Sequence, residues 1–312
     1  WTADAIRLRK SITYNFSRYF NRGGRMSHKK IEKHWGKDTF HHPTIMGDQE
    51  VAEHWDKNAT YYAKAVREKH DLYRELINNP AFFELLGEVN NLRMLDVGCG
   101  EGTTTRMLAD RGAKVTGIDL SEKMIELAKQ HDAKESCGIQ YALTSGSDLS
   151  QFESETFDAA VSTMGMMDMA DYAACVKEVY RVLKPSGFFQ FSILHPCFFT
   201  HAFKWILDKE GKRDGLVTGD YFSLDIDSET TPVDQWFFSG TSHEERENHS
   251  PLQVPRFPKT LSQYFNVLTQ TGFVVENLKE PFADEKVIIK HPEIADSRVI
   301  SYFLIFRCRK CF

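Results

Sequence analysis

Apolar residues recur at helical spacing in residues 48–88. Val51, Trp55 and Ala59 follow one another at four-residue steps, which places them on one face of a helix. Pro80 starts a further helical piece, because proline is favoured in the first turn of a helix. We therefore expect this part of the chain to be helical, with one face packed against the rest of the protein.

Between residues 94 and 194, short apolar runs alternate with amphipathic segments. Such alternation predicts a parallel sheet with helices on both faces. A turn at residues 184–187 precedes the last of the strands. The predicted strands span 94–97, 114–118, 140–143, 157–162 and 188–194, and the predicted helices span 103–111, 121–131 and 172–183.

The alternation stops after residue 195. Residues 196–258 are rich in aromatic, charged and turn-forming side chains and show no clean period. An irregular stretch of this length is uncommon as a simple connection, so we expect a lid or cap with a functional role. A helix is predicted at 260–271. Strands at 273–278 and 301–307 are expected to pair antiparallel across a loop at 279–300.

The composition is that of an ordinary globular protein. Of the 312 residues, 41% are hydrophobic and 27% are charged, and the formal net charge is −5. No apolar run is long enough to cross a bilayer and no secretory signal is visible, so we expect no membrane partner and a cytoplasmic location. The six cysteines are too sparse for a disulfide scaffold and are expected to be free thiols.

The charge is unevenly distributed, since residues 1–37 hold ten Lys or Arg and only two acids. A basic arm of this kind suits contact with nucleic acid or an acidic membrane surface. Apolar residues interleaved with the charges favour an amphipathic helix instead. We expect no nucleic-acid partner and leave open a homo-oligomer formed through the N-terminal helices.

The most informative segment for chemistry is 94–102, where a buried strand runs into three alternate glycines. Gly98, Gly100 and Gly102 let the backbone approach a ligand closely. Position 103 is Thr, so the spacing departs from the G-x-G-x-x-G fingerprint, which places a pyrophosphate at a helix N-terminus. The loop therefore favours a ligand without phosphates.

An acidic residue supplies the second element of this site. Asp119 ends a predicted strand 17 positions beyond Gly102. A carboxylate at such a position can accept hydrogen bonds from both hydroxyls of a ribose. A glycine-rich turn or an acidic residue at a strand end occurs alone in many α/β folds. The two together at this spacing indicate a ligand site rather than a purely structural feature.

These motifs resemble the class I S-adenosylmethionine-dependent methyltransferase superfamily, in particular its small-molecule branch, often called type 11. The resemblance covers about residues 50–195 and resumes at about 260–310. It implies an α/β fold: a Rossmann-like, doubly wound seven-stranded sheet with an antiparallel last strand, N-terminal helices and a cap insertion. The segments that carry it are 95–102, 115–121, 147–149, 157–162 and 181–187.

The resemblance also implies a division of the chain. Residues 1–47 would form the basic arm, 48–195 the cofactor-binding core with its leading helices, 196–258 the cap, and 259–312 the C-terminal part of the core. The implied cofactor is S-adenosylmethionine, with S-adenosylhomocysteine as product. The residues expected to contact it are Tyr62, Gly98, Cys99, Gly100, Asp119, Leu120, Asp148, Leu149, Thr163 and Met164.

Two of the nearby residues carry an additional interpretation. Tyr62 is as well explained by ordinary helix packing as by a cover over the cofactor. Asp96, buried just before the loop, is expected to anchor loop amides rather than to act in catalysis.

His195 is the candidate general base. It follows a strand at the carboxyl edge of the sheet, where ligands bind, and imidazole titrates near neutrality. The alternative is a histidine that positions the cap through a hydrogen bond. Asp168 lies near the same edge, and a solvated loop acid is the favoured interpretation for it.

The aromatic side chains of the cap predict an apolar or aromatic acceptor, methylated on O, N or C and suited to secondary metabolism. Tentative substrate residues are Phe198, Tyr221, Phe222, Arg256 and Phe257. An alternative is C-methylation of an isoprenoid diphosphate held by Arg256 or Lys259, although surface charge is favoured for both. A second alternative is an RNA or protein methyltransferase that uses the basic arm.

Two further pairs of residues are weak metal signals. The pair Cys308 and Cys311 lacks a second pair or an associated histidine, and His41-His42 is equally unsupported. We therefore expect no structural metal.

Overall fold

The structure, a computed structural model, describes residues 46–133, 138–200, 202–222 and 233–311. The chain divides into two compact units, 1–42 and 43–312, and every described residue belongs to the second. The predicted basic arm, its oligomeric role and the pair His41-His42 therefore lie outside the described residues. Within the described residues, no helix is both long and apolar enough to cross a membrane.

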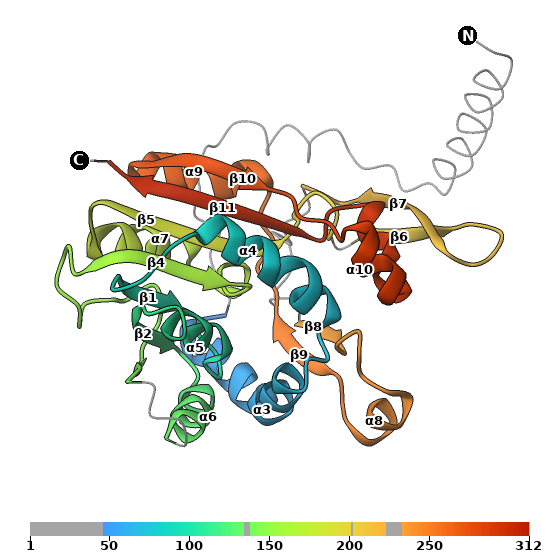
Figure 1. Cartoon of the computed structure of the whole chain (residues 1–312), viewed down its shortest axis with the longest axis horizontal. Coiled ribbons are helices and arrows are strands. Elements are labelled where there is room, and N and C mark those ends of the chain that lie inside the picture. Colours follow the sequence, from blue (N-terminus) through green and yellow to red (C-terminus); the bar gives the residue numbers. More distant parts are fainter. Residues whose placement is uncertain (1–45, 134–137, 201, 223–232, 312) are drawn as a thin grey trace, which may run out of the picture. The chain divides into compact units, whose positions relative to one another are not determined.

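A seven-stranded sheet forms the centre of the fold, in the order β10-β11-β5-β4-β1-β2-β3 (Figure 1). The five strands from β3 to β5 are parallel, β11 runs antiparallel to β5, and β10 runs antiparallel to β11. This confirms the predicted sheet and its reversed last strand. The strands are β1 (Arg93–Val97), β2 (Lys114–Asp119), β3 (Gln140–Leu143), β4 (Phe157–Thr163), β5 (Leu183–Leu194), β10 (Phe273–Lys279) and β11 (Phe303–Lys310).

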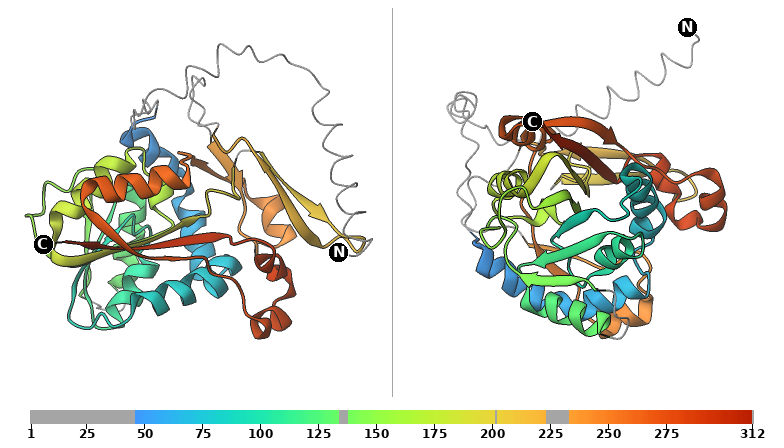
Figure 2. Two further views of the ribbon diagram at one scale, coloured as in Figure 1. Left: turned by 90° about the horizontal axis from the view of Figure 1, so that it is seen from above. Right: turned by 60° about the vertical axis from the view of Figure 1, so that its left-hand side comes forward.

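Successive side chains of the central strands face opposite sides of the sheet, so each face has its own core. On β1, Leu95 packs against α7 and α9, whereas Met94 packs against α4 and α5. Figure 2 shows α4 and α9 on opposite sides of β11. The helices of these two layers are α4 (Asn79–Leu86), α5 (Thr103–Ala109), α7 (Tyr172–Val182) and α9 (Leu261–Thr271).

The leading helices form as the sequence predicts, and they join the core near the site. Asp56 of α3 (Asp48–Arg67) accepts hydrogen bonds from the Ser121 hydroxyl at 2.5 Å and the Lys123 amide at 3.1 Å. It thereby assists Ser121 in capping α6 (Glu122–Asp132). Between α3 and α4 lies a feature that the pattern does not predict, the π-helix η1 (Arg74–Asn78).

The predicted turn at 184–187 is present, but it lies inside β5. Phe157 pairs with Leu183 and Ala159 with Phe188, so the residues between them loop out of the register. The expectation of a loop at 279–300 is wrong. The segment contains α10 (Glu285–Lys290) and the 3₁₀-helix η3 (Pro292–Arg298). Elements this short are defined by tertiary packing, here the fully buried Ile294, rather than by an apolar period.

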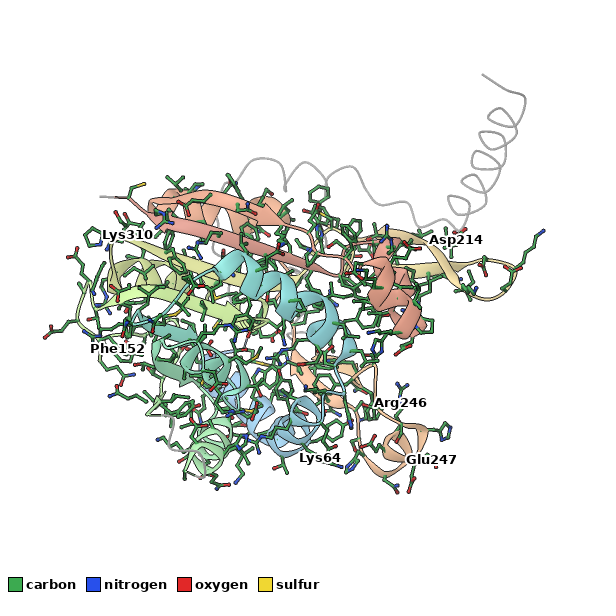
Figure 3. All side chains as sticks on the ribbon, viewed as in Figure 1. Lys64, Phe152, Asp214, Arg246, Glu247 and Lys310 are labelled. Carbon is green, nitrogen blue, oxygen red and sulfur yellow. The ribbon has the colours of Figure 1, made fainter. Side chains whose placement is uncertain are left out.

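The cap is more regular than its sequence indicates. It holds two antiparallel strand pairs: β6 (Ala202–Leu207) with β7 (Arg213–Gly219), and β8 (Val233–Trp236) with β9 (Leu252–Pro255). Between β8 and β9 lies α8 (His243–Asn248). Figure 3 shows Lys64 of α3 close to Arg246 and Glu247 of α8, in agreement with the 3.7 Å between Lys64 Nζ and Glu245 Oε1.

The strands of the cap escaped prediction because their side chains do not alternate. Most residues of β6 and β7 are exposed on both faces, so a half-buried strand pattern is missing. The second pair gains its order from a distant helix, since Asn58 of α3 bonds the backbone of Gln253 in β9.

Candidate active site

The glycine-rich loop joins β1 to α5 at the carboxyl edge of the sheet. Gly98 has φ +68° and Gly102 has φ +90°, in the left-handed region that favours glycine. A Cβ on Gly98 would lie 3.3 Å from Cε of Met169, so a side chain there would crowd the segment after β4. The amide of Cys99 donates to the carbonyl of Ile118 at 2.9 Å, which ties the loop to β2.

Asp119 fixes this loop from the end of β2. Its Oδ2 accepts a hydrogen bond from the Gly100 amide at 2.8 Å, and its Oδ1 accepts one from the Ser121 amide at 2.9 Å. Burial raises the pKa of Asp119 to about 6, so the group is still ionised at neutral pH. Each oxygen keeps accepting capacity for a ligand hydroxyl.

Tyr62 of α3 lies over the same loop. Its ring carbon Cε1 is 4.0 Å from the point that a Cβ on Gly100 would occupy. Its hydroxyl accepts a hydrogen bond from Nη1 of Arg74 at 3.2 Å. The structure therefore brings Tyr62 to the predicted site, where its ring closes one side of the loop.

Arg74 is the residue of this site that sequence reasoning missed. Its side chain is buried, and Nη2 donates to the hydroxyl of Thr104 in α5 at 3.3 Å. Its Nε is buried without a partner, and no carboxylate of the described residues forms an ion pair with it. A buried guanidinium with unused donors next to a ligand loop points to an anionic group of the ligand. An arginine inside a helical run gives no such signal in sequence.

The end of β4 borders the loop from the other side. The hydroxyl of Thr163 lies 2.7 Å from the hydroxyl of Thr104, and so continues the polar chain from Arg74. Met164 has φ +61°, an uncommon conformation for a residue with a side chain, and its amide donates to Ser192 at 3.0 Å. The contact of both residues with the cofactor stays a prediction.

The interpretation of Asp96 as an anchor of loop amides is wrong. Its Oδ2 accepts from the hydroxyl of Thr105 at 2.7 Å, and its Oδ1 is buried without a partner. Asp96 thus supports the first turn of α5 rather than the loop itself.

Residues 147–149, the segment predicted to hold adenine, support their prediction less well than the glycine-rich loop and Asp119 do. Leu149 is fully buried in the core, and its amide donates to Glu178 of α7 at 3.0 Å. Asp148 is exposed, accepts from the Ser150 amide at 3.1 Å, and lines an open pocket with Lys177 and Arg181. The contact of Asp148 with adenine stays a prediction, as does that of Leu120, which is half-buried beside Asp119.

His195 is buried, and both of its ring nitrogens have partners. Nε2 lies 2.7 Å from Oε1 of Glu280, and Nδ1 accepts from the Cys197 amide at 3.3 Å. Burial lowers the pKa of His195, with Glu280 acting in the opposite direction. These contacts favour the positioning alternative, in which His195 holds the start of the cap, over the general base.

Asp168 ends the 3₁₀-helix η2 (Met166–Asp168) next to the glycine loop. Asp168 is half-buried rather than fully solvated as expected, and this desolvation raises its pKa to about 8. Lys259 is not a surface charge either: burial lowers its pKa to about 8, and its Nζ donates to the Phe257 carbonyl at 2.9 Å. Both side chains are desolvated and yet half-buried, and Lys259 Nζ lies 3.5 Å from the carbonyl of Met169, the residue after Asp168.

The structure separates the predicted substrate residues into two groups. Arg256 and the buried Phe257 lie in the segment that leads to Lys259, and Arg256 pairs with Asp234 at 3.0 Å. Phe198 packs on His195, with ring centroids 4.6 Å apart. The remaining two point elsewhere: the hydroxyl of Tyr221 accepts from the Leu261 amide at 2.8 Å, and Phe222 is 78% exposed.

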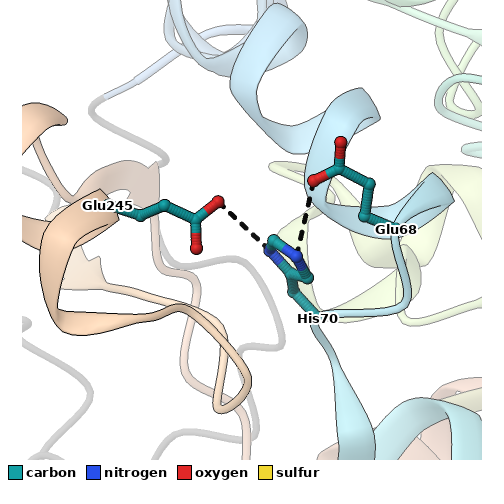
Figure 4. Close-up of side chains that lie close together, drawn as sticks. All are labelled: Glu68, His70 and Glu245. Carbon is teal, nitrogen blue, oxygen red and sulfur yellow. Dashed lines mark ion pairs between the residues drawn. The ribbon is translucent and has the colours of Figure 1, made fainter.

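One cluster of the described residues has the composition of a metal site. Oxygen and nitrogen atoms of Glu68, His70 and Glu245 lie within 4.8 Å of one another, with His70 between the two carboxylates (Figure 4). Lys64 lies 3.9 Å from Glu68 and 3.7 Å from Glu245, so an ammonium group already neutralises the carboxylates. Ion pairs between α3 and α8 account for this cluster. The pair Cys308 and Cys311 is split between a buried and an exposed position.

Comparison with known proteins identifies the fold. The sequence profile described as "Methyltransferase domain" matches residues 95–191. An S-adenosylmethionine dependent methyltransferase from Mesorhizobium loti is 28% identical, with a TM-score of 0.59 over 74% of this chain and 96% of that chain. Residues 95–191 therefore form a methyltransferase domain, and the fold is that of the class I S-adenosylmethionine-dependent methyltransferase superfamily. A second structure, from Listeria monocytogenes, is 26% identical, with a TM-score of 0.57 over 73% and 94% of the two chains.

The curated relatives share a name with one another and match this chain over only part of their length. "Ubiquinone biosynthesis O-methyltransferase" of Hydrogenovibrio crunogenus is 34% identical over 115 residues, which are 36% of this chain and 47% of that protein. The protein of the same name from Pseudomonas syringae pv. tomato is 28% identical over 144 residues, 45% of this chain and 57% of that protein. The chain thus spans about half the length of the curated relatives it matches.

The residues of this site fit the superfamily's cofactor, S-adenosylmethionine. The unused donors of buried Arg74 suit the carboxylate of the methionine part. The ionised Asp119 suits the ribose hydroxyls, and the bare glycine backbone leaves room for the chain between these two ends. No phosphate-binding arrangement is needed, in agreement with the spacing of the glycines.

Proposed function

We propose that this protein transfers a methyl group from S-adenosylmethionine to a hydroxyl oxygen of a small aromatic or apolar molecule. The observation that carries the proposal is the convergence of Arg74, Asp119 and the loop 98–102 at one edge of the sheet. Oxygen is favoured as the acceptor atom because the curated relatives are named O-methyltransferases.

Methyl transfer from a sulfonium requires little covalent chemistry from the protein itself. When bound, S-adenosylmethionine supplies a methyl group already activated on a sulfonium. The chain must therefore bind it, align the acceptor and remove a proton. We assign the methionine end to Arg74 and Tyr62, the ribose to Asp119, and the region of the reacting methyl to Thr163 and Met164.

The acceptor is proposed to bind on the cap side of the loop, against Phe257, Arg256 and Phe198. Aromatic walls favour an acceptor with an apolar or aromatic body. Phe222 and Tyr221 are weaker candidates, because the first is largely exposed and the second caps α9 through its hydroxyl.

The other acceptors have less support. A diphosphate needs free cationic donors, whereas Arg256 is paired with Asp234 and bonded to the Phe199 carbonyl. An RNA or protein substrate would rely on the basic arm, which lies outside the described residues. The names of the relatives give no support to a role in secondary metabolism.

Calorimetric titration with S-adenosylmethionine and S-adenosylhomocysteine is the first test, followed by label transfer to a panel of phenols, catechols and aliphatic alcohols. We expect binding of both compounds and label in an ether product. Absence of cofactor binding would overturn the proposal at its base. Binding with transfer only to nitrogen or carbon acceptors would remove the hydroxyl but keep the enzyme class.

A cytoplasmic location is also proposed. Its support is that the five described cysteines are free, as is usual for thiols in a reducing compartment. Localisation of the tagged full-length protein by microscopy tests it.

A further inference from the structure

An acidic and a basic residue come close to each other beside the cofactor loop, since Lys259 Nζ lies 3.5 Å from the carbonyl of Met169, the residue after Asp168. Asp168 lies at the end of η2, after β4, and Lys259 lies in the segment between β9 and α9. Each influences the charge state of the other, yet the two form no direct ion pair. Among the described residues, Asp168 has no hydrogen bond that would offset the cost of desolvating its carboxyl group.

The position of Asp168 follows from its neighbours in sequence. A Cβ on Gly98 would lie 3.3 Å from Met169 Cε and 3.6 Å from Gly165 Cα, so the residues on both sides of Asp168 lie against the first glycine of the loop. The charge of Asp168 also acts on Tyr62, whose ring covers Gly100. The carboxyl group is therefore next to the cofactor site.

The side chain of Asp168 is unusual in having no partner. It accepts no hydrogen bond from the described residues, and only electrostatic interactions with its surroundings act on it. Asp171, three residues later, differs in being exposed and in capping α7 through the Ala174 amide at 2.8 Å. Of these two acids, only Asp168 has both oxygens available to a ligand.

The ammonium group of Lys259 has partners within the described residues for only two of its three N–H groups. Its Nζ donates to the carbonyls of Phe257 at 2.9 Å and Met169 at 3.5 Å, which leaves the third N–H without a described partner. The ammonium also lies over the rings of Tyr172, Phe257 and Tyr264, at 5.7, 5.7 and 5.8 Å from their centroids. Aromatic faces stabilise a buried cation, so they help to keep the amine charged.

We propose that Asp168 and Lys259 bind the reacting hydroxyl group of the acceptor, with Asp168 taking its proton and Lys259 holding the oxygen anion. A phenolic hydroxyl fits best, because phenols lose a proton at a pKa of about 10, far below that of an aliphatic alcohol. The assignment of a reacting hydroxyl rests on the proposed function. The pair itself rests on its placement beside Gly98 and Phe257.

The electrostatic interactions around Asp168 and Lys259 support these roles. Burial raises the pKa of Asp168 to about 8, and Lys259 and Arg256 oppose that shift while Asp234 adds to it. Burial lowers the pKa of Lys259 to about 8, against the opposing effect of Asp168, Asp171 and Cys175. The charge of Asp168 also raises the pKa of Tyr62 and of Tyr264. A carboxyl group with so high a pKa is a stronger base than an ordinary aspartate.

The proposed step is balanced in atoms and charge. A lone pair of the acceptor oxygen forms the new O–C bond to the methyl group. The S–C bond breaks with its electron pair remaining on sulfur, which becomes an uncharged thioether. The hydroxyl proton passes to a carboxylate oxygen of Asp168, and Lys259 stays protonated throughout.

The test uses the full chain with S-adenosylhomocysteine and 4-nitrophenol, whose anion absorbs visible light and whose neutral form does not. Near pH 8, where each of the two groups is about half ionised, the carboxylate form of Asp168 repels a bound anion and the ammonium form of Lys259 attracts it. We therefore expect Asp168→Asn to bind nitrophenolate about tenfold more tightly, and Lys259→Met to bind it about tenfold more weakly. Asp171→Asn, which keeps the helix cap, is the control and should match the wild type.

The rate of methyl transfer adds a second readout. Asp168→Asn should lower kcat by about 10²–10⁴-fold, the usual effect of losing a general base. Its affinity for S-adenosylmethionine should stay unchanged. The combination of tighter anion binding and slower transfer is specific to a base. Equal or weaker nitrophenolate binding by Asp168→Asn, or no binding by any variant, would overturn the proposal.

Failure of the proposed function gives a different pattern. A first outcome is that Asp168→Asn and Lys259→Met shift nitrophenolate binding in opposite directions while no hydroxyl compound is methylated. That result would support the anion-binding site and contradict the proposed O-methyl transfer. If methyl transfer to phenols is found but Asp168→Asn keeps its kcat, the enzyme class stands and this base assignment is wrong.

Discussion

His195 and Glu280 form a partly buried hydrogen bond between the end of β5 and the segment after β10. Nε2 of His195 lies 2.7 Å from Oε1 of Glu280. Because Nδ1 accepts from the Cys197 amide, Nε2 carries the proton and donates it. A neutral histidine in this arrangement has no nitrogen left for an acceptor proton, but it holds two chain segments together.

A structural role for His195 predicts loss of stability without loss of cofactor binding. Replacement by Gln leaves buried groups unpaired, at a cost of about 1–3 kcal/mol. We expect the Tm of His195→Gln to fall by several degrees while the calorimetric Kd for S-adenosylhomocysteine stays unchanged. His243→Gln is the control, since that side chain is 89% exposed. A large loss of kcat with an unchanged Tm would restore the general base.

The same histidine predicts how stability depends on pH. Its pKa is lowered in the folded state, so the unfolded chain takes up a proton at a higher pH than the folded chain does. The stabilising contribution is therefore complete above the unfolded pKa of about 6.5 and declines as the pH falls below it. Denaturant unfolding at several pH values should show a smaller decline for His195→Gln than for the wild type.

Asp119 predicts a pH dependence of cofactor binding. Its pKa of about 6 means that the carboxylate, which accepts hydrogen bonds, is lost below that pH. Cofactor affinity should therefore be constant above pH 7 and fall as the pH drops through about 6. Asp119→Asn should bind about 10–100-fold more weakly at neutral pH and lose this pH dependence, because charge-assisted hydrogen bonds are the stronger kind.

A matched surface change checks the specificity of that result. Asp110→Asn, at the exposed end of α5, should leave both the affinity and its pH profile as in the wild type. An Asp119→Asn protein that keeps the acid-side decline would assign it to another group, such as Asp96, whose pKa burial also raises to about 6.

The local parts of the site could be predicted from sequence because their signals are local. The glycines need their own backbone angles, and Asp119 reaches the Gly100 amide from the neighbouring strand of a regular sheet. Strand order and the reversed β11 followed from the resemblance. These features depend on spacing and on the geometry of parallel strands, both of which the sequence carries.

The remaining parts depend on contacts between distant segments. In the sequence, Arg74 and Lys259 look like ordinary surface charges, because the residues next to them along the chain give no sign that they are buried. Lys259 is desolvated by Tyr172 and Tyr264, and Arg74 by packing against Tyr62 and the loop. Charge state and burial at such positions are properties of the assembled fold rather than of a pattern.

Arg74 predicts a selective loss of affinity for the amino-acid part of the cofactor. Arg74→Met should weaken S-adenosylhomocysteine binding by about 10–100-fold, because it removes charge-assisted hydrogen bonds to a carboxylate. Methylthioadenosine, which lacks that part, should bind to the variant and the wild type alike. Arg111→Met serves as the control, as Arg111 is exposed and donates only to a helix carbonyl. Equal losses for both ligands would indicate a general structural effect instead.

Asn58 predicts how the cap is held to α3. Its Nδ2 donates to the Gln253 carbonyl at 2.7 Å, and its Oδ1 accepts from the Gln253 amide at 3.1 Å. Asn58→Ala leaves both backbone groups of β9 without a partner, at about 1–3 kcal/mol for each group that stays buried.

We expect faster hydrogen exchange at residues 252–255 and a lower Tm for Asn58→Ala, with protection of β1 and β4 unchanged. Asn58→Asp should be intermediate, because a carboxylate accepts from the amide but cannot donate to the carbonyl. Asn248→Ala, on the exposed side of α8, should match the wild type. Unchanged exchange at Gln253 in Asn58→Ala would mean that apolar contacts of Leu252 and Val254 with α3 suffice to hold the strand.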